Sequence, residues 1–137
     1  MRIMALDVGE KNIGVAVSDA NLLTAQGRPT LKRTGWEADL RQLRRLVEEN
    51  EVERIVVGRP LHMGGQESRQ SQRMKRFAMK LSKILSLPVI LWDERLTSFE
   101  AEQQLEAAGL NWRERKKHVD KVAAMLILQD YLDSRPQ

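Results

Sequence analysis

The sequence contains no cysteine and no long hydrophobic run. Without cysteine, the chain can form neither a disulfide framework nor a thiolate metal site. A membrane-spanning helix needs roughly 20 consecutive apolar residues, and no apolar stretch comes near that length. The N-terminus has no signal-peptide pattern, because Asp7 interrupts its short apolar stretch. These absences predict a cytoplasmic protein without a membrane partner.

What the sequence does have is the length of one ordinary domain and a small excess of positive charge. Its 137 residues can bury a core without covalent staples, and no repeat or linker divides them, so we expect one domain over residues 1–137. The 23 basic and 19 acidic residues give a formal net charge of +4. This excess suits a polyanionic partner such as nucleic acid, although it does not prove one.

The N-terminal stretch predicts a β-hairpin. An apolar run of strand length ends at Asp7, a turn bracketed by Gly9 and Gly14 follows, and the β-rich run 13–17 returns. A carboxylate at the end of a strand that is buried on both faces needs a cation or hydrogen bonds to compensate it. The two glycines would let the backbone approach a phosphate or a metal-bound oxygen closely. Alternatively, Asp7 only opens the turn, because aspartate favours turns.

The rest of the chain alternates between apolar runs typical of strands and amphipathic stretches typical of helices. We expect an edge strand within 21–33 and buried parallel strands at 54–58 and 89–92. Helices are expected from a Thr34/Glu37 capping box to about Asn50, from the loop 59–65 to before Pro88, from a Thr97/Glu100 capping box to Gly109, and over 119–132, with a mobile loop at 111–118. This order predicts an α/β fold with a mixed five-stranded sheet, in which three antiparallel strands precede two parallel ones and helices cover both faces.

The expected helix before Pro88 carries a row of basic residues and almost no acidic ones. Its inward stripe should comprise Met74, Phe77, Ala78, Leu81, Ile84 and Leu85. The opposite side carries Arg69, Arg73, Arg76, Lys80 and Lys83. Such a row is either a solvated helix face or a surface that binds nucleic acid. The expected loop adds Arg113, Arg115, Lys116 and Lys117 beside Trp112, whose ring could stack on an unpaired base.

Three acidic positions fall where one site could collect them. Asp7 and the pair Asp93–Glu94 follow strands, and open α/β sheets place their sites at the carboxyl ends of strands. Asp120 could reach the same place from the first turn of the last helix. Clustered carboxylates repel one another unless a divalent cation neutralises them, and oxygen ligands suit Mg²⁺ or Mn²⁺. Each acid alone could instead serve a turn, an ion pair or a helix start.

Four stretches of the chain resemble the YqgF/RuvX family, relatives of the RNase H-like Holliday junction resolvases. They keep the family's order and spacing over nearly the whole chain and lie at 7–19, 57–60, 93–98 and 119–124. The resemblance implies an RNase H-like fold and a metal-dependent nuclease that hydrolyses phosphodiester bonds. Members are usually described as the nuclease that matures the 5′ end of pre-16S rRNA in ribosome biogenesis, and some as Holliday junction resolvases. The implied partners are pre-rRNA or branched DNA, with ribosomal particles as a further partner.

The sequence departs from the family's pattern in the loop after its fourth strand. Where the family commonly has Leu, Asn and Asp, this chain has Arg59, His62 and Gly64, and substrate specificity is the property that these changes put in doubt. Compared with the wider RNase H-like superfamily, the fourth strand ends in Gly58 in place of an acid. The second carboxylate must therefore come from the neighbouring strand, from Glu94 or Asp93.

For roles at this site, we expect Asp7 to bridge the metal ions and Glu94 and Asp120 to complete their shell as catalytic residues. Asp93 is the alternative to Glu94, because neighbours on a strand point to opposite faces and apolar residues occupy both faces of this one. The longer glutamate has the greater reach across Gly58, which favours Glu94. Candidate substrate contacts are Lys11, Arg69, Arg73, Arg76, Trp112, Arg113 and Lys117. His62 and His118 are either proton shuttles or plain loop residues.

Three alternatives compete with the rRNA nuclease. A four-way DNA junction would need two sites and hence a dimer, whereas one RNA cut needs only a monomer or weak homodimer. A non-catalytic nucleic-acid-binding module would explain the basic stretches but not the acids. The sugar-kinase and actin-like class shares the Asp-x-Gly hairpin, but this chain is too short for the second lobe that encloses ATP.

Overall fold

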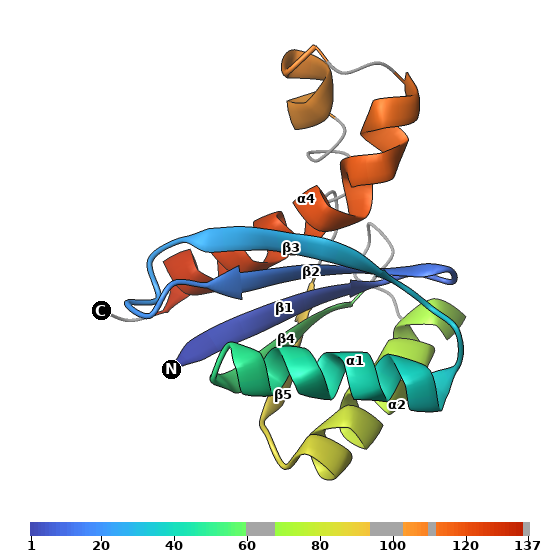
Figure 1. The fold of residues 1–137 in the computed structure, drawn as a ribbon, viewed down its shortest axis with the longest axis vertical. Coiled ribbons are helices and arrows are strands. Elements are labelled where there is room, and N and C mark those ends of the chain that lie inside the picture. The colour runs from blue at the N-terminus through green and yellow to red at the C-terminus, as the bar shows by residue number, and fades with distance from the viewer. Residues whose placement is uncertain (60–67, 94–102, 110–111, 136–137) are drawn as a thin grey trace.

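The structure, a computed structural model, describes residues 1–59, 68–93, 103–109 and 112–135, and of residues 112–117 it describes the backbone only. The strands are β1 (Arg2–Val8), β2 (Asn12–Ser18), β3 (Ala25–Lys32), β4 (Val52–Arg59) and β5 (Val89–Asp93) (Figure 1). The helices are α1 (Trp36–Glu49), α2 (Arg69–Leu85) and α4 (Trp112–Ser134), and residues 103–107 are also helical. Each expected strand is present, with ends that differ by one or two residues from the apolar runs.

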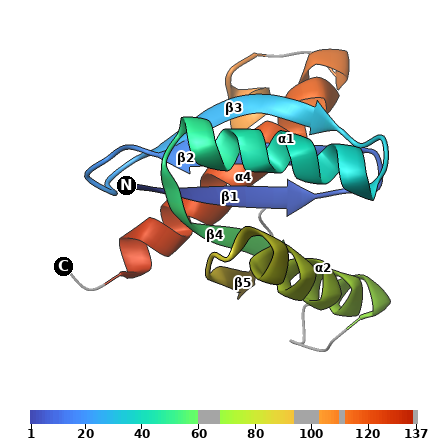
Figure 2. The same ribbon diagram turned by 60° about the horizontal axis from the view of Figure 1, so that its bottom comes forward.

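The five strands form one mixed sheet in the order β3-β2-β1-β4-β5 (Figure 2). Strand β2 pairs antiparallel with β1 and with β3, whereas β4 pairs parallel with β1 and with β5. The predicted sheet of three antiparallel and two parallel strands is therefore confirmed. The edge position of β3 suits its Pro29, because proline cannot donate to a neighbouring strand.

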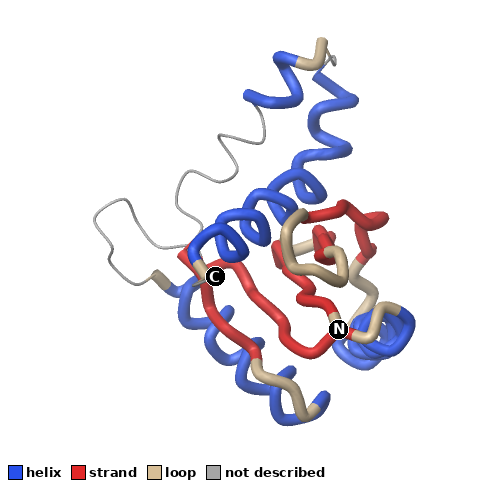
Figure 3. Tube along the Cα trace, turned by 90° about the vertical axis from the view of Figure 1, so that its left-hand side faces the viewer, coloured by secondary structure: helices blue, strands red, loops and turns tan. Residues whose placement is uncertain are grey.

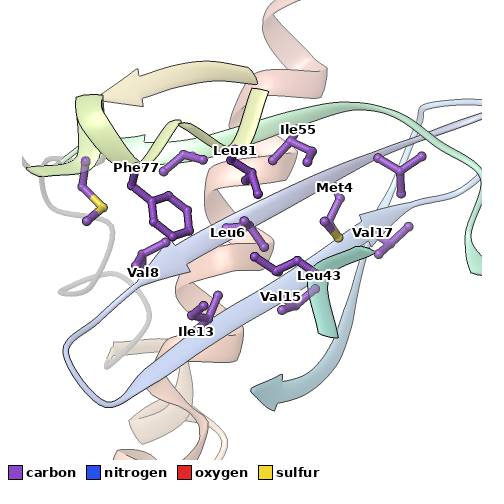
Figure 4. Close-up of a cluster of buried hydrophobic side chains, with 13 residues drawn as sticks. Met4, Leu6, Val8, Ile13, Val15, Val17, Leu43, Ile55, Phe77 and Leu81 are labelled. Atoms are coloured by element: carbon purple, nitrogen blue, oxygen red, sulfur yellow. The ribbon is translucent and has the colours of Figure 1, made fainter. Parts of the chain in front are cut away.

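Helices cover both faces of the sheet, as Figure 3 shows in a view along it. On one face, Met4, Leu6 and Val8 of β1 join a core that α1 and α2 close with Leu43, Phe77 and Leu81 (Figure 4). On the other face, Ile3 and Ala5 join a second core with Ala124, Ile127 and Leu128 of α4. Each fully buried aliphatic side chain stabilises the fold by roughly 1.5–3 kcal/mol. The alternation along β1 thus assigns odd-numbered positions to the α4 face.

The start of α1 differs from the prediction. The N-cap residue is Gly35, with φ of 136°, and no side chain caps the helix, so the expected Thr34/Glu37 capping box is wrong. The carboxylate of Asp39 takes that place and accepts the backbone N–H of Thr34 at 3.0 Å. The second expected capping box, Thr97/Glu100, lies outside the described residues. The helical segment 103–107 is followed by a turn that contains Gly109, whose φ is 81°.

Helix α4 begins earlier than predicted, so the mobile loop expected at 111–118 is wrong for residues 112–118. That segment has no glycine or proline and is rich in Arg, Lys and Glu, which favour helices even without an apolar stripe. Its turns extend beyond the sheet (Figure 1). The buried face is also shifted: Ala123 and Ile127 are buried as expected, but Val119, Val122 and Leu126 are only half-buried, and Ala124, Leu128 and Tyr131 are buried in their place.

Helix α2 buries Met74, Phe77, Ala78 and Leu81 as predicted, whereas Ile84 is 36% exposed. None of the described helices is both long and apolar enough to span a membrane.

Candidate metal centre

Asp7 lies within the last part of β1, at the edge of the sheet where the parallel strands end. Its register partner across the hairpin is Gly14 of β2. Residues directly opposite each other on antiparallel strands direct their side chains to the same face. That face is the one covered by α4, because Ile3 and Ala5 alternate with it. The carboxylate of Asp7 is therefore on the α4 side of the sheet, where its side chain is half-buried.

Asp120 arrives at the same place from α4. A Cβ at Gly14 would overlap the carbonyl group of Asp120 and would lie 3.1 Å from Asp120 Cβ. The α4 backbone thus rests directly on Gly14, the residue opposite Asp7. This contact brings Asp120 to the face of the β1–β2 pair to which Asp7 is directed. The close approach that the sequence assigned to a phosphate or metal-bound oxygen at Gly14 is made by helix α4.

Small residues on neighbouring strands let α4 come this close. Ala5, Ala16 and Ala124 are fully buried between the sheet and α4. At Gly27 of β3, an added Cβ would lie 2.9 Å from the sulfur of Met125. Because these residues are small, the part of α4 that carries Asp120 can lie directly on the end of β1 and β2.

Burial raises the pKa of the Asp120 carboxyl above its ordinary value of 3.8. Removal from water disfavours the charged form of an acid, and a neighbouring cation would reverse that effect. A half-buried carboxylate on the same face as a second one is a donor set that suits a hard divalent cation. The pair supplies oxygen ligands only.

Asp93 is directed away from this pair. Along β5, Ile90 and Trp92 belong to the core beneath α4, whereas Val89 and Leu91 belong to the core beneath α1 and α2. Alternation therefore assigns the exposed Asp93 to the α2 side, the face opposite Asp7. Its register partner Arg59 confirms that direction, because Nε of Arg59 donates to Oγ of Ser71 on α2 at 2.8 Å. Glu94 lies outside the described residues.

Within the described ranges, no three acidic or histidine side chains come close enough together to hold a metal ion. Asp7 and Asp120 are thus the described part of the candidate centre. His118 is a half-buried residue of α4, not of a loop, and His62 and Gly64 lie outside the described residues. Arg59, which differs from the family's common leucine, joins the end of β4 to α2 through its hydrogen bond to Ser71.

The basic row of α2 is exposed along its length, as predicted for Arg69, Arg73, Arg76, Lys80 and Lys83. Nζ of Lys80 lies 4.2 Å from the centre of the Trp36 ring and so packs against α1. Arg69 and Arg73 lie near the N-terminus of α2, which the Arg59–Ser71 contact holds at the end of β4. Lys11 is exposed in the turn between β1 and β2.

The remaining basic candidates belong to the first turns of α4. The backbone at Trp112, Arg113, Arg115, Lys116 and Lys117 is helical, and the directions of these side chains are outside what the structure describes.

Sequence reasoning did not single out Arg33 and Asp39. Their side chains form an ion pair of 3.3 Å beside the turn that follows Asp7. No motif marks either residue, because both stand among many charged residues at a helix start.

Comparison with known proteins shows the family of the chain. The family described as RuvX, Holliday junction resolvase, matches residues 1–134. A protein of Thermoanaerobacter pseudethanolicus named "Putative pre-16S rRNA nuclease" is 48% identical over 136 residues, which are 98% of each chain. A protein of the same name from Heliobacterium modesticaldum is 50% identical over 135 residues, covering 98% of this chain and 91% of its own.

Two solved structures share the fold. RuvC of T. thermophilus in complex with a Holliday junction substrate has a TM-score of 0.59 at 12% identity, over 98% of this chain and 95% of RuvC. The Fowlpox virus resolvase in complex with Holliday junction DNA has a TM-score of 0.58 at 15% identity, over 98% of both chains. At such identities the likeness concerns the fold, and it confirms the expected RNase H-like architecture.

Proposed function

The chain belongs to the RuvX family, and from this premise we propose that it is a divalent-metal-dependent endonuclease that processes the 5′ end of pre-16S rRNA. The observation that carries the proposal is the placement of Asp120 against Gly14, the register partner of Asp7. A binding module would have no need for two half-buried acids on the same face of the sheet.

We assign the metal ligands to Asp7, Asp120 and Glu94. Asp7 and Asp120 share the α4 face, and Asp93 belongs to the other face. Strand alternation favours the position after Asp93 for the third ligand, and the length of glutamate adds to that preference. Oxygen donors of this kind fit Mg²⁺ or Mn²⁺, which when bound would stabilise the charge that develops on the phosphoryl oxygens.

The basic side chains bind the substrate in this proposal. Lys11, two positions beyond Gly9 and exposed, contacts a phosphate next to the bond that is cut. Arg69, Arg73 and Arg76 of α2 bind the backbone phosphates of the same strand farther along, since this row carries no acidic residue that would oppose a polyanion. Trp112, Arg113 and Lys117 form a second contact region on the first turns of α4.

Precursor rRNA is the favoured substrate because relatives at 48% and 50% identity over nearly the full chain carry that name. The family description, by contrast, names the Holliday junction. Symmetric resolution of a junction needs two active sites, so this second substrate would require a dimer, whereas the rRNA cut is made by a monomer or weak homodimer.

One side-by-side assay tests the proposal. Purified protein with Mg²⁺ or Mn²⁺ is given a labelled precursor fragment that spans the 5′ end of 16S rRNA and, separately, a synthetic four-way junction. We expect a single cut in the precursor that EDTA abolishes and that Asp7→Asn lacks. Symmetric cuts in the junction with an intact precursor would transfer the function to junction resolution. Binding of both substrates without cleavage of either would leave a non-catalytic binding module.

A further inference from the structure

A buried carboxylate outside the candidate metal centre holds an arginine in one orientation. The side chain of Asp39 is 2% exposed, and its Oδ2 lies 3.3 Å from Nε of Arg33. Its other oxygen accepts the N–H of Thr34 at 3.0 Å. A buried charge is costly unless it is paired and hydrogen-bonded, so Asp39 depends on Arg33 and fixes it in return.

The other end of the Arg33 guanidinium contacts the turn that follows Asp7. Its Nη1 donates to the carbonyl oxygen of Gly9 at 2.8 Å. The backbone N–H of Arg33 donates to the carbonyl oxygen of Lys11, also at 2.8 Å. Inside the turn, the N–H of Gly9 donates to the carbonyl oxygen of Asn12 at 2.9 Å. Arg33 therefore holds the turn at two points, one of which is the backbone of Lys11.

The same arginine joins this turn to α2. Its guanidinium carbon lies 6.0 Å from the centre of the Phe77 ring, and Phe77 packs edge-on against Trp36 with ring centres 5.6 Å apart. A guanidinium can serve these neighbours together because its donors form a rigid planar fork. A lysine carries its three donors on one nitrogen and so lacks the separate Nε and Nη1 that contact Asp39 and Gly9.

We propose that Arg33, oriented by Asp39, is a positioning residue that holds the turn 9–12 so that Lys11 binds a substrate phosphate beside Asp7. This inference rests on the nuclease function proposed above. Arg33 does not touch the reacting atoms; it acts through Lys11. The competing possibility is that the Arg33–Asp39 pair only stabilises the start of α1.

A double-mutant cycle between Arg33 and Lys11 separates the two possibilities. Arg33→Gln, Lys11→Met and the double variant are compared with the wild type by kcat and KM for the precursor fragment and by thermal unfolding. A small misplacement of a substrate-positioning group can cost up to about a hundredfold in rate, so we expect each single change to lower kcat/KM by roughly tenfold or more. The double variant should be no slower than the slower single one, because Lys11 out of place contributes nothing. Losses that multiply, or an Arg33→Gln protein with wild-type kinetics, would overturn the proposal.

For Asp39→Asn, general electrostatics and loss of positioning predict opposite effects. The amide oxygen can still accept the Thr34 N–H, the protein becomes more positive, and Arg33 keeps its charge without the partner that orients it. General electrostatics would then tighten binding to a polyanion, whereas loss of positioning should lower kcat/KM. If Asp39→Asn does not fold, Arg33→Lys replaces it, since it keeps the charge and removes the fork. Wild-type kcat/KM in the folded variant would contradict the proposal.

Binding in EDTA keeps the result independent of cleavage. With a fluorescein-labelled precursor RNA, we expect Lys11→Met to lower the slope of log K against log salt by about 0.7 to 0.9. Arg33→Lys should lower it equally, and adding Lys11→Met to Arg33→Lys should lower it no further. If the wild type cleaves nothing and this coupling holds, the proposed function fails and the positioning role stands. If the wild type cleaves and the slopes are additive, the positioning role fails alone.

Discussion

Gly14 of β2 lies against the carbonyl group of Asp120 of α4, with no room for a side chain between them. An added Cβ would overlap that carbonyl and would lie 3.1 Å from Asp120 Cβ. Because Gly14 is also the register partner of Asp7, this one contact places Asp120 on the strand pair that carries Asp7.

Gly14→Ala should therefore damage both stability and activity. The added methyl group meets backbone, which cannot move without shifting α4, and overpacking of this kind costs about 1–3 kcal/mol of the free energy of unfolding. Denaturant unfolding measures that loss, and the cleavage rate should fall in the protein that remains folded.

Gly27→Ala, on strand β3 where it faces the same helix α4, is the matched control. An added Cβ there would lie 2.7 Å from Cε of Lys121 and 2.9 Å from Sδ of Met125, both of which belong to the outer part of a flexible side chain. The two side chains can move aside, so the change should cost less than about 1 kcal/mol and leave cleavage intact. Equal losses for Gly14→Ala and Gly27→Ala would refute the special role of the Asp120 contact.

Stability without metal should depend on pH through Asp120. Because burial raises the folded-state pKa of this carboxyl, the folded protein holds its proton more tightly than the unfolded chain does. Its favourable contribution is present below the unfolded value of 3.8 and is lost as the pH rises through the folded pKa.

Asp120→Asn should therefore raise Tm in EDTA at pH 7, and the gain should shrink as the pH falls toward 3.8. Saturating Mn²⁺ should reverse the order, since a ligand that binds only the folded state stabilises the wild type. A lower Tm for Asp120→Asn in EDTA at neutral pH would contradict this account of the site.

The α2 row should contribute to nucleic-acid affinity. Replacing Arg69, Arg73 and Arg76 with Gln should flatten the dependence of log K on log salt by about 0.7 to 0.9 for each lost phosphate contact. The control is the same replacement at Arg41, Arg44 and Arg45, which are exposed on α1 among Glu37, Glu48 and Glu49. Equal slopes for the two triple variants would show that the basic row of α2 is only a solvated helix face.

The identity of the third metal ligand can be tested by changing the neighbours Asp93 and Glu94 separately. Glu94→Gln should abolish cleavage and weaken Mn²⁺ binding, whereas Asp93→Asn should retain cleavage within a few-fold, because alternation directs Asp93 to the α2 side. A titration of Mn²⁺ into both variants decides between them: a larger loss of affinity in Asp93→Asn would reverse the assignment.

The sheet was predictable from the sequence because strands buried on both faces read as short apolar runs between turn residues. The mixture of antiparallel and parallel strands followed from the hairpin and from the crossover connections. The start of α4 was not predictable in this way, since residues 112–118 favour a helix through propensity and carry no apolar stripe. The Thr34/Glu37 spacing was misleading, because the buried Asp39 accepts the Thr34 N–H that Glu37 would have accepted in a capping box.

The candidate site was predictable in its residue types but not in its construction. Strand-end acids and a helix-borne Asp120 suggested one cluster, yet only the structure shows that Gly14 seats α4 beside Asp7. The sequence of β5 is apolar on both faces, so it could not show to which face Asp93 is directed. The structure shows this, because alternate residues of β5 belong to two separate cores. The Arg33–Asp39 pair joins a strand end to a helix start, and its contact with Gly9 requires the folded hairpin.

Single-turnover cleavage by Asp7→Asn is the most direct test of the metal-centre assignment. The change is nearly isosteric, so the variant should unfold at the wild-type temperature in EDTA while losing a metal-bridging charge. Loss of several kcal/mol of transition-state stabilisation corresponds to a rate about a thousandfold lower or more. We expect that loss together with weakened Mn²⁺ binding. A folded Asp7→Asn protein that cleaves the precursor at close to the wild-type rate would contradict the assignment.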